Sequence, residues 1–524
     1  MHRSSRVAYT LLSVAAVIAM VGCIFRGVRV APLSRAEDIE VRSPVKVHLL
    51  NGETAVFEDG LRVAGDTVRG AGVVYGLTQV DRARGISVRA IPLDSVAAME
   101  SFSGYTKSAT SVAVSTLLVG GGIVGGVALL KELFGSCPTI YSDSAGTPVL
   151  EAEGFSYSIS PLLERRDIHR LRAEPDSHGV LALDVRNEAL ETHYINQLEL
   201  LGVTRGADEY VLPDAREHAL AVRELKPISR AVDRAGNDVT GTIAHDDGLV
   251  FRSDLRTIDH VSAGDLDDWI DLTIPVSSGT DSVALLFNLR NSLLNTVLLY
   301  DEMLSAQGAH AVDFEAEDLN NISDMVRIGR WYGGHMGMHV SVRRGSRWDT
   351  VAYVPDAGPI AWREVAAVVP APPGDTLRVR LSFVADEWRI GKIGVAMRLR
   401  HPAPETFAPS ALVEANGAPA DTAMASVAAL DARYLETTPG QRFTLRFTTG
   451  APPRDSVRTF LLATEGYYTE WVRGKWIRQA RATGERSFSA SDTTLAETVR
   501  HWRDVAPTFE SQFAHTRIPT GALP

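Results

Sequence analysis

The sequence has very little cysteine. Its 524 residues include only Cys23 and Cys137. Two cysteines exclude a disulfide framework and any metal site built from several thiolates. A chain of this length can instead rely on buried apolar surface for its stability. At roughly 100 to 200 residues per domain, we expect about three or four folded units.

Positive charge is also scarce relative to negative charge. The chain carries 64 acidic and 53 basic residues, which gives a net charge of −11. A general nucleic-acid binder shows a basic patch or stripe, so this balance argues against nucleic acid as a partner. An acidic balance by itself favours solubility and does not indicate any particular binding partner.

Signature motifs of the common enzyme classes are absent. The sequence has no Gly-x-Ser-x-Gly elbow, no His-Glu-x-x-His pair, no phosphate loop and no dinucleotide glycine fingerprint. Asp176, Ser177 and His178 are adjacent in the chain and do not form a triad by themselves. We therefore predict no catalytic residue and no cofactor. A glycosidase stays open as an alternative, because its two acids need no sequence signature.

The first 22 residues have the three parts of an export signal. Arg3 and Arg6 supply positive charge, an apolar run extends over 7–21, and Gly22 is a small residue at the end. The apolar run is short for a membrane span. We therefore predict a signal peptide over residues 1–22.

Met20-Val21-Gly22-Cys23 resembles the lipobox of bacterial lipoproteins. The resemblance implies that the Cys23 thiol receives a diacylglycerol and becomes the N-terminus after cleavage, which makes membrane lipid a partner. Arg26 and Arg29 depart from the pattern, because positive charge after the site opposes export. The alternative is an uncleaved signal anchor in which Cys23 is incidental. The lipoprotein interpretation places the protein in the bacterial cell envelope, anchored on the extracytoplasmic side at the outer membrane or the periplasmic face.

A second apolar segment, residues 108–130, contains no charged residue and is long enough to cross a bilayer. Gly121, Gly122, Gly125 and Gly126 are spaced so that a helix would present a flat face for close packing against another helix. The alternatives are a buried helix or a hairpin in a soluble protein. If the segment spans a membrane, the residues before and after it lie on opposite sides, as in an inner-membrane protein with two spans.

The remainder of the chain has the alternation of apolar and polar residues that predicts a mainly β protein. We expect a small N-terminal barrel, a glycine-rich membrane-type helix, and β-sandwich domains with a few inserted helices. The predicted units are an anchor linker over 23–43, a small β-barrel over 44–102, a β-sandwich over 138–290, a helical connection over 291–334, a jelly-roll-like part over 335–400, a Pro/Ala-rich linker over 401–427, and a β-rich domain with a terminal helix over 428–524.

Residues 336–398 contain the segments "WREV", "LRVRLSF" and "DEWRIGKIGV". This pattern resembles galactose-binding-like jelly-roll sandwiches, which often end in a Trp-x-Ile-Asp-x-Val strand. Gly391 stands where aspartate is usual in that strand. The resemblance implies a module that binds sugars or cell-surface ligands.

Tryptophans near this segment are candidates for stacking on a sugar ring. Trp348 follows the polar turn "RRGSR", so Arg344 and Arg347 beside it can hydrogen-bond a ligand. Trp362 is a further candidate for ligand binding, whereas Trp388 lies in an apolar strand and is expected in the core. Core packing is the alternative for each of these tryptophans.

Two short stretches are weak candidates for a metal site. "HMGMH" offers His335 and His339, which share one face of an extended strand, and soft ligands of this kind suit copper. Asp265, Asp267 and Asp268 crowd one loop, where carboxylates can hold calcium. The alternatives are the start of a strand and a solvated acidic turn.

These patterns together predict a lipid-anchored envelope protein with a binding or scaffolding role. Polysaccharide, peptidoglycan or another envelope protein is the expected partner. A glycan-active envelope enzyme and a two-span inner-membrane protein are the alternatives.

Overall fold

The computed structural model describes the strands of residues 26–106 and most of residues 137–513. Three sequence predictions lie outside the described residues: the signal peptide, the lipobox at Met20–Cys23 and the glycine-rich segment over 108–130. In the described part of the chain, no helix is both long and apolar enough to cross a membrane. The described residues are 26–32, 39–42, 45–49, 54–57, 59–75, 86–106, 137–159, 163–189, 191–311, 314, 322–430, 434–437, 440–453, 456–470, 476, 479 and 488–513.

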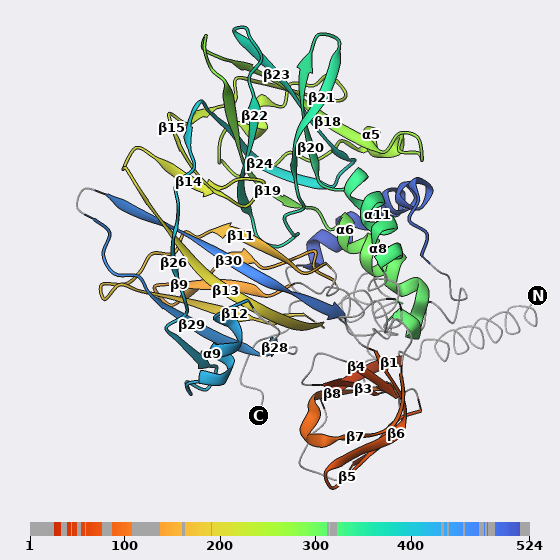
Figure 1. Ribbon diagram of the computed structural model, residues 1–524. Coiled ribbons are helices and arrows are strands. Elements are labelled where there is room, and N and C mark those ends of the chain that lie inside the picture. The colour runs from red at the N-terminus through yellow and green to blue at the C-terminus, as the bar shows by residue number, and fades with distance from the viewer. Residues whose placement is uncertain are drawn as a thin grey trace, which may run out of the picture.

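The protein is mainly β, as the sequence predicts (Figure 1). Its N-terminal part is one curled antiparallel sheet around its own apolar core. Gly70 and Gly72 let the sheet close over Phe57, because a Cβ on Gly72 would lie 2.6 Å from the Phe57 ring. The strands, in sheet order, are β1 (Arg26–Pro32), β8 (Val96–Thr106), β3 (Val45–Leu49), β4 (Thr54–Phe57), β6 (Thr67–Tyr75), β5 (Leu61–Ala64) and β2 (Ile39–Val41), with β7 (Ile86–Pro92) on β6.

The first sandwich packs two sheets over a core that includes Phe155, Leu198 and Phe447. Its longest pairing joins β13 to β30 along nearly their whole lengths. One sheet consists of β10 (Thr147–Glu153), β9 (Thr139–Ser144), β12 (Val180–Arg186), β29 (Arg442–Thr448) and β27 (Ala411–Glu414). The other consists of β11 (Arg165–Arg170), β30 (Val457–Glu470), β13 (Glu191–Arg205) and β26 (Glu405–Phe407), with β28 (Leu435–Thr437) on β13.

The second sandwich is built around Phe287, Phe383 and Trp388, all nearly or completely buried. A small sheet covers part of its outer face, where Leu212 and Leu220 pack against neighbours of the sandwich. One main sheet consists of β16 (Lys226–Pro227), β24 (Trp388–Ala396), β19 (Ser282–Asn291) and β22 (Arg363–Pro370). The other consists of β17 (Arg230–Asp233), β18 (Asp267–Pro275), β23 (Thr376–Val384), β20 (Met338–Arg344) and β21 (Arg347–Val354). The covering sheet consists of β14 (Tyr210–Pro213), β15 (Ala219–Arg223) and β25 (Arg398–Arg400).

Helices pack together beside the two sandwiches (Figure 1). The terminal helix α11 follows Ser491, whose hydroxyl accepts from the Thr494 N–H as an N-cap. Trp502 on α11 donates its indole N–H to Asp386 of the second sandwich at 2.9 Å. The helical elements of this group are α6 (Leu294–Val297), the π-helix η4 (Leu298–Leu304), η5 (Ser305–His310), α8 (Ile322–His335) and α11 (Asp492–Phe513). Short helices are η2 (Leu93–Ser95), α4 (Thr240–Ile243), α5 (Leu255–Asp259) and α9 (Asp421–Val427).

Several predicted boundaries differ from the structure. Strands predicted as one sandwich over 138–290 are divided between the two sandwiches: β11 and β12 pair with β30 and β29 in the first, whereas β18 and β19 pair with β23 and β22 in the second. The predicted linker over 401–427 contributes β26, β27 and α9, and the predicted linker over 23–43 contributes β1 and β2. Alternation of apolar residues identifies strands but not their partners.

Replacement of Trp388 by alanine should lower the free energy of unfolding by about 3–5 kcal/mol, because its indole is fully buried. Trp348 is half-buried and lies 4.6 Å from the Arg380 guanidinium, so its loss should cost only about 0.5–2 kcal/mol. Urea unfolding of both variants, followed by circular dichroism, measures the difference. Equal losses would contradict this assignment of core and surface.

Candidate functional site

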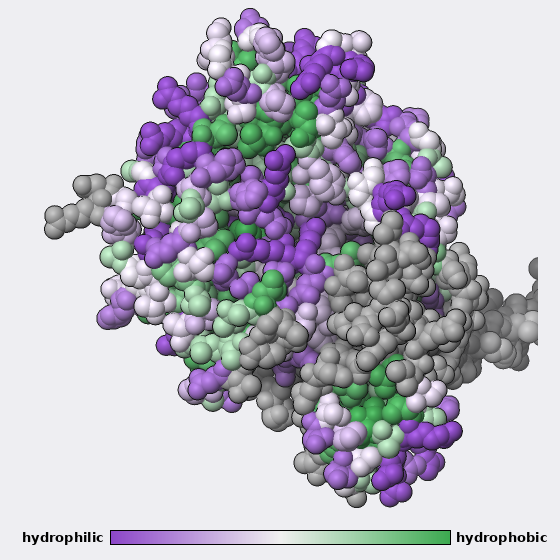
Figure 2. Space-filling model, in the orientation of Figure 1, coloured by the Kyte–Doolittle hydropathy of each residue, from purple (hydrophilic) through white to green (hydrophobic). Residues whose placement is uncertain are grey.

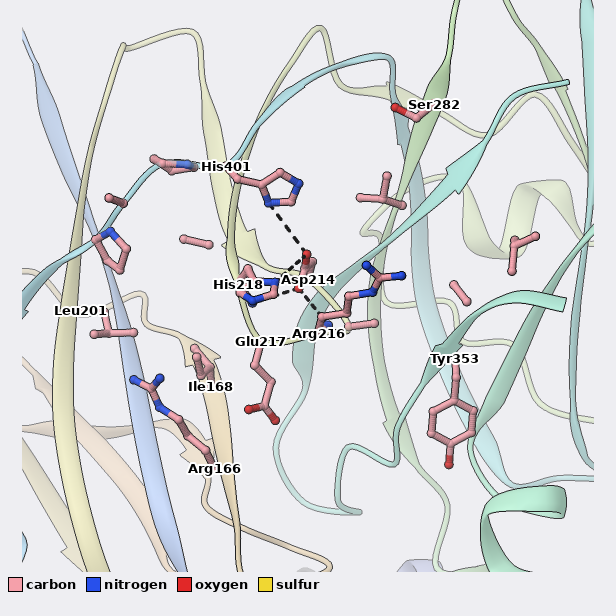
Figure 3. Close-up of a pocket in the computed structure, with 18 of the residues that line it drawn as sticks. Arg166, Ile168, Leu201, Asp214, Arg216, Glu217, His218, Ser282, Tyr353 and His401 are labelled. Carbon is pink, nitrogen blue, oxygen red and sulfur yellow. Dashed lines mark hydrogen bonds and ion pairs between the residues drawn. The ribbon is translucent and has the colours of Figure 1, made fainter. Parts of the chain in front are cut away.

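A groove of about 940 Å³ lies between the two sandwiches (Figure 3). β11 and β13 of the first sandwich form one wall. β21 and β22 of the second sandwich form the other, and the turn between β14 and β15 lies between them. On the face shown in Figure 2, hydrophilic residues gather across the middle of the molecule, with hydrophobic patches above and below.

Asp214 fixes the turn that projects into the groove. One carboxylate oxygen accepts the backbone N–H groups of Arg216 and His218 at 2.8 and 2.9 Å. The backbone of the turn is tied to the second sandwich, because the Ala215 N–H donates to the Ala366 carbonyl at 2.8 Å. The turn therefore holds its side chains at a fixed place relative to both walls.

Two imidazoles flank the other oxygen of Asp214 (Figure 3). His218 Nδ1 lies 3.8 Å from Asp214 Oδ2, and His401 Nδ1 lies 3.9 Å from it. The rings are almost perpendicular, with centroids 6.5 Å apart. Both histidines are exposed, so each can exchange hydrogen bonds with a ligand while Asp214 orients the pair.

Glu217 projects from the same turn toward Arg166 (Figure 3). Its backbone is left-handed, with φ +65°, which side chains other than glycine rarely adopt. Burial raises the pKa of the Glu217 carboxyl, and nearby arginines offset part of that rise. Among the described residues, no side-chain hydrogen bond or ion pair holds this carboxyl. Strained residues of this kind concentrate at functional sites.

The walls combine polar and apolar surface. Arg166 donates to Glu199 at 2.7 Å on the first sandwich, which leaves further N–H groups of the guanidinium for a ligand. Val351, Pro402 and Pro404 supply apolar lining. The groove therefore offers hydrogen-bond donors, acceptors and apolar faces along its length.

The sequence-predicted ligand residues lie outside this groove. Trp348 belongs to a ladder in which Arg380 stacks on both Trp348 and Trp269, at 4.6 and 4.5 Å. Arg344 pairs with Asp349 at 3.7 Å, and Arg347 is exposed at the same hairpin. One face of the Trp348 indole therefore carries an arginine.

Trp362 is the more open of the two predicted aromatic sites, with 40% of its surface exposed. Its ring lies over Gly391, where a Cβ would approach it to 3.3 Å. Arg290 lies 5.4 Å from the same ring. Gly391, which stands where the jelly-roll family usually has aspartate, therefore makes room for the Trp362 indole.

The predicted metal candidates have other partners. His335 pairs with Asp492 at 3.0 Å, and burial lowers the pKa of His339 beside Tyr353. In the described residues, no group of three or more His, Cys, Asp or Glu side chains is arranged to hold a metal ion.

The structure gives the three aspartates of the candidate calcium loop different environments. Asp265 pairs with Arg234 at 2.6 Å, and Asp267 is exposed. Asp268 is buried, hydrogen-bonds Ser253 at 2.5 Å, and has a pKa raised by burial to about 6. The alternation of a strand turns successive carboxyls to opposite faces.

Sequence reasoning missed Asp214, Glu217, His218 and His401. "PDAREH" carries a turn signal, but no local pattern shows that the turn meets His401 far along the chain. The groove arises from the packing of separate sheets, and that packing leaves no signature in any one segment.

No protein-family model and no curated protein matches the chain. Among solved structures, it is similar to the C-terminal CBM6 of LamC, a marine laminarinase from Zobellia galactanivorans (9% identity, TM-score 0.15, 38% of this chain and 98% of that one). It is also similar to a GH31 α-xylosidase from Xanthomonas citri (9% identity, TM-score 0.17, 82% of this chain and 38% of that one). A third similar structure is the secreted serine protease VesC from Vibrio cholerae (8% identity, TM-score 0.14, 71% of this chain and 99% of that one). The chain spans 38% of the xylosidase. TM-scores this low define neither the fold nor the function.

Replacement of Glu217 by glutamine should stabilise the protein increasingly as pH rises. A carboxyl with a raised pKa binds its proton more tightly in the folded state, so stability is lost as pH rises above the unfolded pKa. Glutamine mimics the protonated form and avoids this loss. Urea unfolding at several pH values between 4 and 8 measures the difference between variant and wild type.

Glu224→Gln is the matched control, because Glu224 is also left-handed (φ +55°) but is exposed and pairs with Arg398. A stability difference for Glu217→Gln that is the same at every pH would contradict a buried carboxyl at this position.

Proposed function

We propose that the protein binds a polysaccharide in the groove between its two sandwiches. The observation that carries the proposal is an open groove of about 940 Å³ in which hydrogen-bonding side chains of both charges alternate with apolar surface. Sugar hydroxyls donate and accept hydrogen bonds, and a pyranose ring has apolar faces that suit proline and valine. Ligand sites of this kind combine apolar lining with a few placed polar groups.

The charge of the lining favours a neutral chain over a polyanion. Arg166 and Arg216 are matched by Glu199, Glu217 and Asp281, besides Asp214 under the two imidazoles. A polyanion would meet carboxylates on both sides of the groove. Neutral polysaccharides are therefore the preferred class, and peptidoglycan is a second ligand to test.

We further propose that Cys23 carries a lipid and holds this binding unit at the extracytoplasmic side of the bacterial cell envelope. The support is the lipobox-like Met20–Cys23 after an apolar run, followed by the glycine-rich segment with Gly121, Gly122, Gly125 and Gly126. Another envelope protein is the proposed partner for that segment. The role is then to retain a glycan near a membrane.

A glycan-active enzyme is the second candidate, and Glu217 is the observation that favours it. A general acid needs a pKa raised toward the working pH, and burial raises the pKa of Glu217 inside the groove. Asp214 on the same turn supplies another carboxylate. Reducing-sugar release by the wild type, abolished in Glu217→Gln with binding retained, would establish the enzyme in place of the binding protein.

His401→Ala should weaken retention on the polysaccharide that the wild type binds by about tenfold, roughly the 1–2 kcal/mol of a ligand hydrogen bond. Affinity electrophoresis against a panel of neutral polysaccharides and peptidoglycan measures retention. His178→Ala is the matched control, because His178 is exposed on a different loop.

Trp348→Ala and Trp362→Ala test the two sequence-predicted aromatic sites in the same assay. Retention lost in either of these variants and kept in His401→Ala would move the site away from the groove. Retention of the wild type on no member of the panel would contradict glycan binding.

Cys23→Ala should abolish metabolic labelling with a radioactive or clickable fatty acid in the bacterial host and leave an unprocessed precursor. The reason is that the thiol is the proposed acceptor of the diacylglycerol. Cys137→Ala is the natural control, since Cys137 is buried. Unchanged labelling and size in Cys23→Ala would rule out this anchor.

A further inference from the structure

A second hollow of about 250 Å³ lies where the two sandwiches meet the helices α6, η4 and α8. Of the residues that line it, only Tyr353 also lines the groove. Its lining divides into a polar end on β11, α6 and the loop after β21, and an apolar end on η4 and α8. The hollow is therefore separate from the groove and has its own chemistry.

Asn295 presents an unused acceptor at the polar end. Its Nδ2 donates to Tyr157 Oη at 3.3 Å and to Asp356 Oδ1 at 3.2 Å, which fixes the carboxamide. Its Oδ1 has no hydrogen-bond partner among the described residues, although the side chain is only 8% exposed. A buried acceptor without a partner is unfavourable, so a ligand that donates a hydrogen bond there gains affinity.

Arg165 presents unused donors beside it. The guanidinium lies 5.9 Å from the Tyr157 ring, and in the described part of the chain it makes neither an ion pair nor a hydrogen bond. An arginine in this setting can donate several hydrogen bonds to a ligand. The polar end therefore has donors and an acceptor that the protein itself leaves unsatisfied.

The walls of the cavity are aromatic and aliphatic. Tyr157 and Tyr332 lie with ring centroids 6.5 Å apart and a 47° tilt. Leu298 and Met303 come from η4, a π-helix, and such segments occur frequently at functional sites. These walls suit a ligand with an apolar body.

The charge around the polar end opposes an anionic ligand. Asp356 and Glu387 are both buried, and burial raises the pKa of each carboxyl, so this end of the cavity already disfavours negative charge. Glu153 also lines the cavity and accepts the Ile360 N–H at 2.9 Å. Arg165 is the one cationic side chain among the described residues of the lining, which also include the carboxyls of Glu153 and Asp356.

Gly329 and Gly333 mark the mouth of the cavity on α8. Both are exposed and line the hollow, and a Cβ added at either would meet no atom within 4 Å. Large side chains at these positions would narrow the entrance without disturbing the core.

We propose that this cavity binds one small neutral ligand with hydroxyl groups at one end and an apolar body at the other, the chemistry of a monosaccharide glycoside with an aryl or alkyl group. Arg165 and Asn295 bind the hydroxyls. Tyr157, Tyr332 and the side chains of η4 enclose the apolar body. This site does not depend on polysaccharide binding in the groove.

The test is isothermal titration of the full chain with 4-nitrophenyl glycosides of glucose, galactose and xylose, with benzoate as an anionic comparison. We expect a neutral glycoside to bind and benzoate to bind at least tenfold more weakly. Gly329→Leu should reduce glycoside affinity at least tenfold by closing the mouth. Gly334→Leu is the matched control, because Gly334 is also exposed on α8 with open space at its Cβ but does not line the cavity.

Arg165→Met removes the donors without breaking any contact with a carboxylate and should also reduce affinity at least tenfold. Thermal unfolding of each variant confirms that it is folded. Three results would overturn the proposal: no neutral glycoside binds, benzoate binds as tightly, or Gly329→Leu binds like the wild type. Unchanged glycoside binding in His401→Ala, whatever that variant does to polysaccharide retention, separates this site from the groove.

Discussion

The structure depends most on one buried polar network at the junction of the two sandwiches and the helices. Asn291 lies at its centre: its side-chain oxygen accepts from Tyr157 Oη at 2.7 Å, and its Nδ2 donates to Asp356 at 3.0 Å. Asp356 also accepts from Tyr332 on α8, and its partner Glu387 accepts the Gly337 N–H at 2.7 Å. Burial without these bonds would cost more than the bonds themselves contribute. The network therefore fixes the sandwiches and α8 in one arrangement.

A buried ion pair also joins the two sandwiches at the wall of the groove. Arg363 at the start of β22 pairs with Asp167 on β11 at 2.6 Å, and both are almost fully buried. The Arg363 guanidinium and the neighbouring His169 hold the pKa of Asp167 well below its usual range. Removal of one partner of such a pair leaves a buried charge, which costs about 3–5 kcal/mol. The groove and the enclosed cavity are thus two consequences of how the sandwiches are joined.

The sequence predicts secondary structure and burial well where the signal comes from residues close together in the chain. The mainly β class and the core position of Trp388 follow from alternation and composition, and the structure agrees. The predicted groups of strands differ, because β30 from the end of the chain completes a sheet begun by β11 and β13. Pairing of this kind joins residues far apart in the sequence, and local periodicity carries no information about it.

The same limit applies to the candidate site. Trp348 has the sequence context of an exposed platform, but the local sequence does not show that Arg380 from another strand stacks on its ring. Glu217 and His401 carry no local signal, and only the packing of β14, β15 and the chain after β25 brings them to one groove. Residues that are brought together only where two domains pack are therefore the ones that sequence reasoning fails to find.

The buried polar network around Asn291 and Asp356 holds the junction together. The most direct test is the pH dependence of the free energy of unfolding for wild type and Asp356→Asn, because asparagine keeps the shape of the side chain and removes its titration. The Asp356 and Glu387 carboxyls bind protons more tightly in the native protein than in the unfolded chain, so wild-type stability should fall as pH rises above the unfolded carboxyl pKa. We expect Asp356→Asn to flatten that fall, so that its stability relative to wild type grows with pH. Identical pH profiles for the two proteins would contradict the claim.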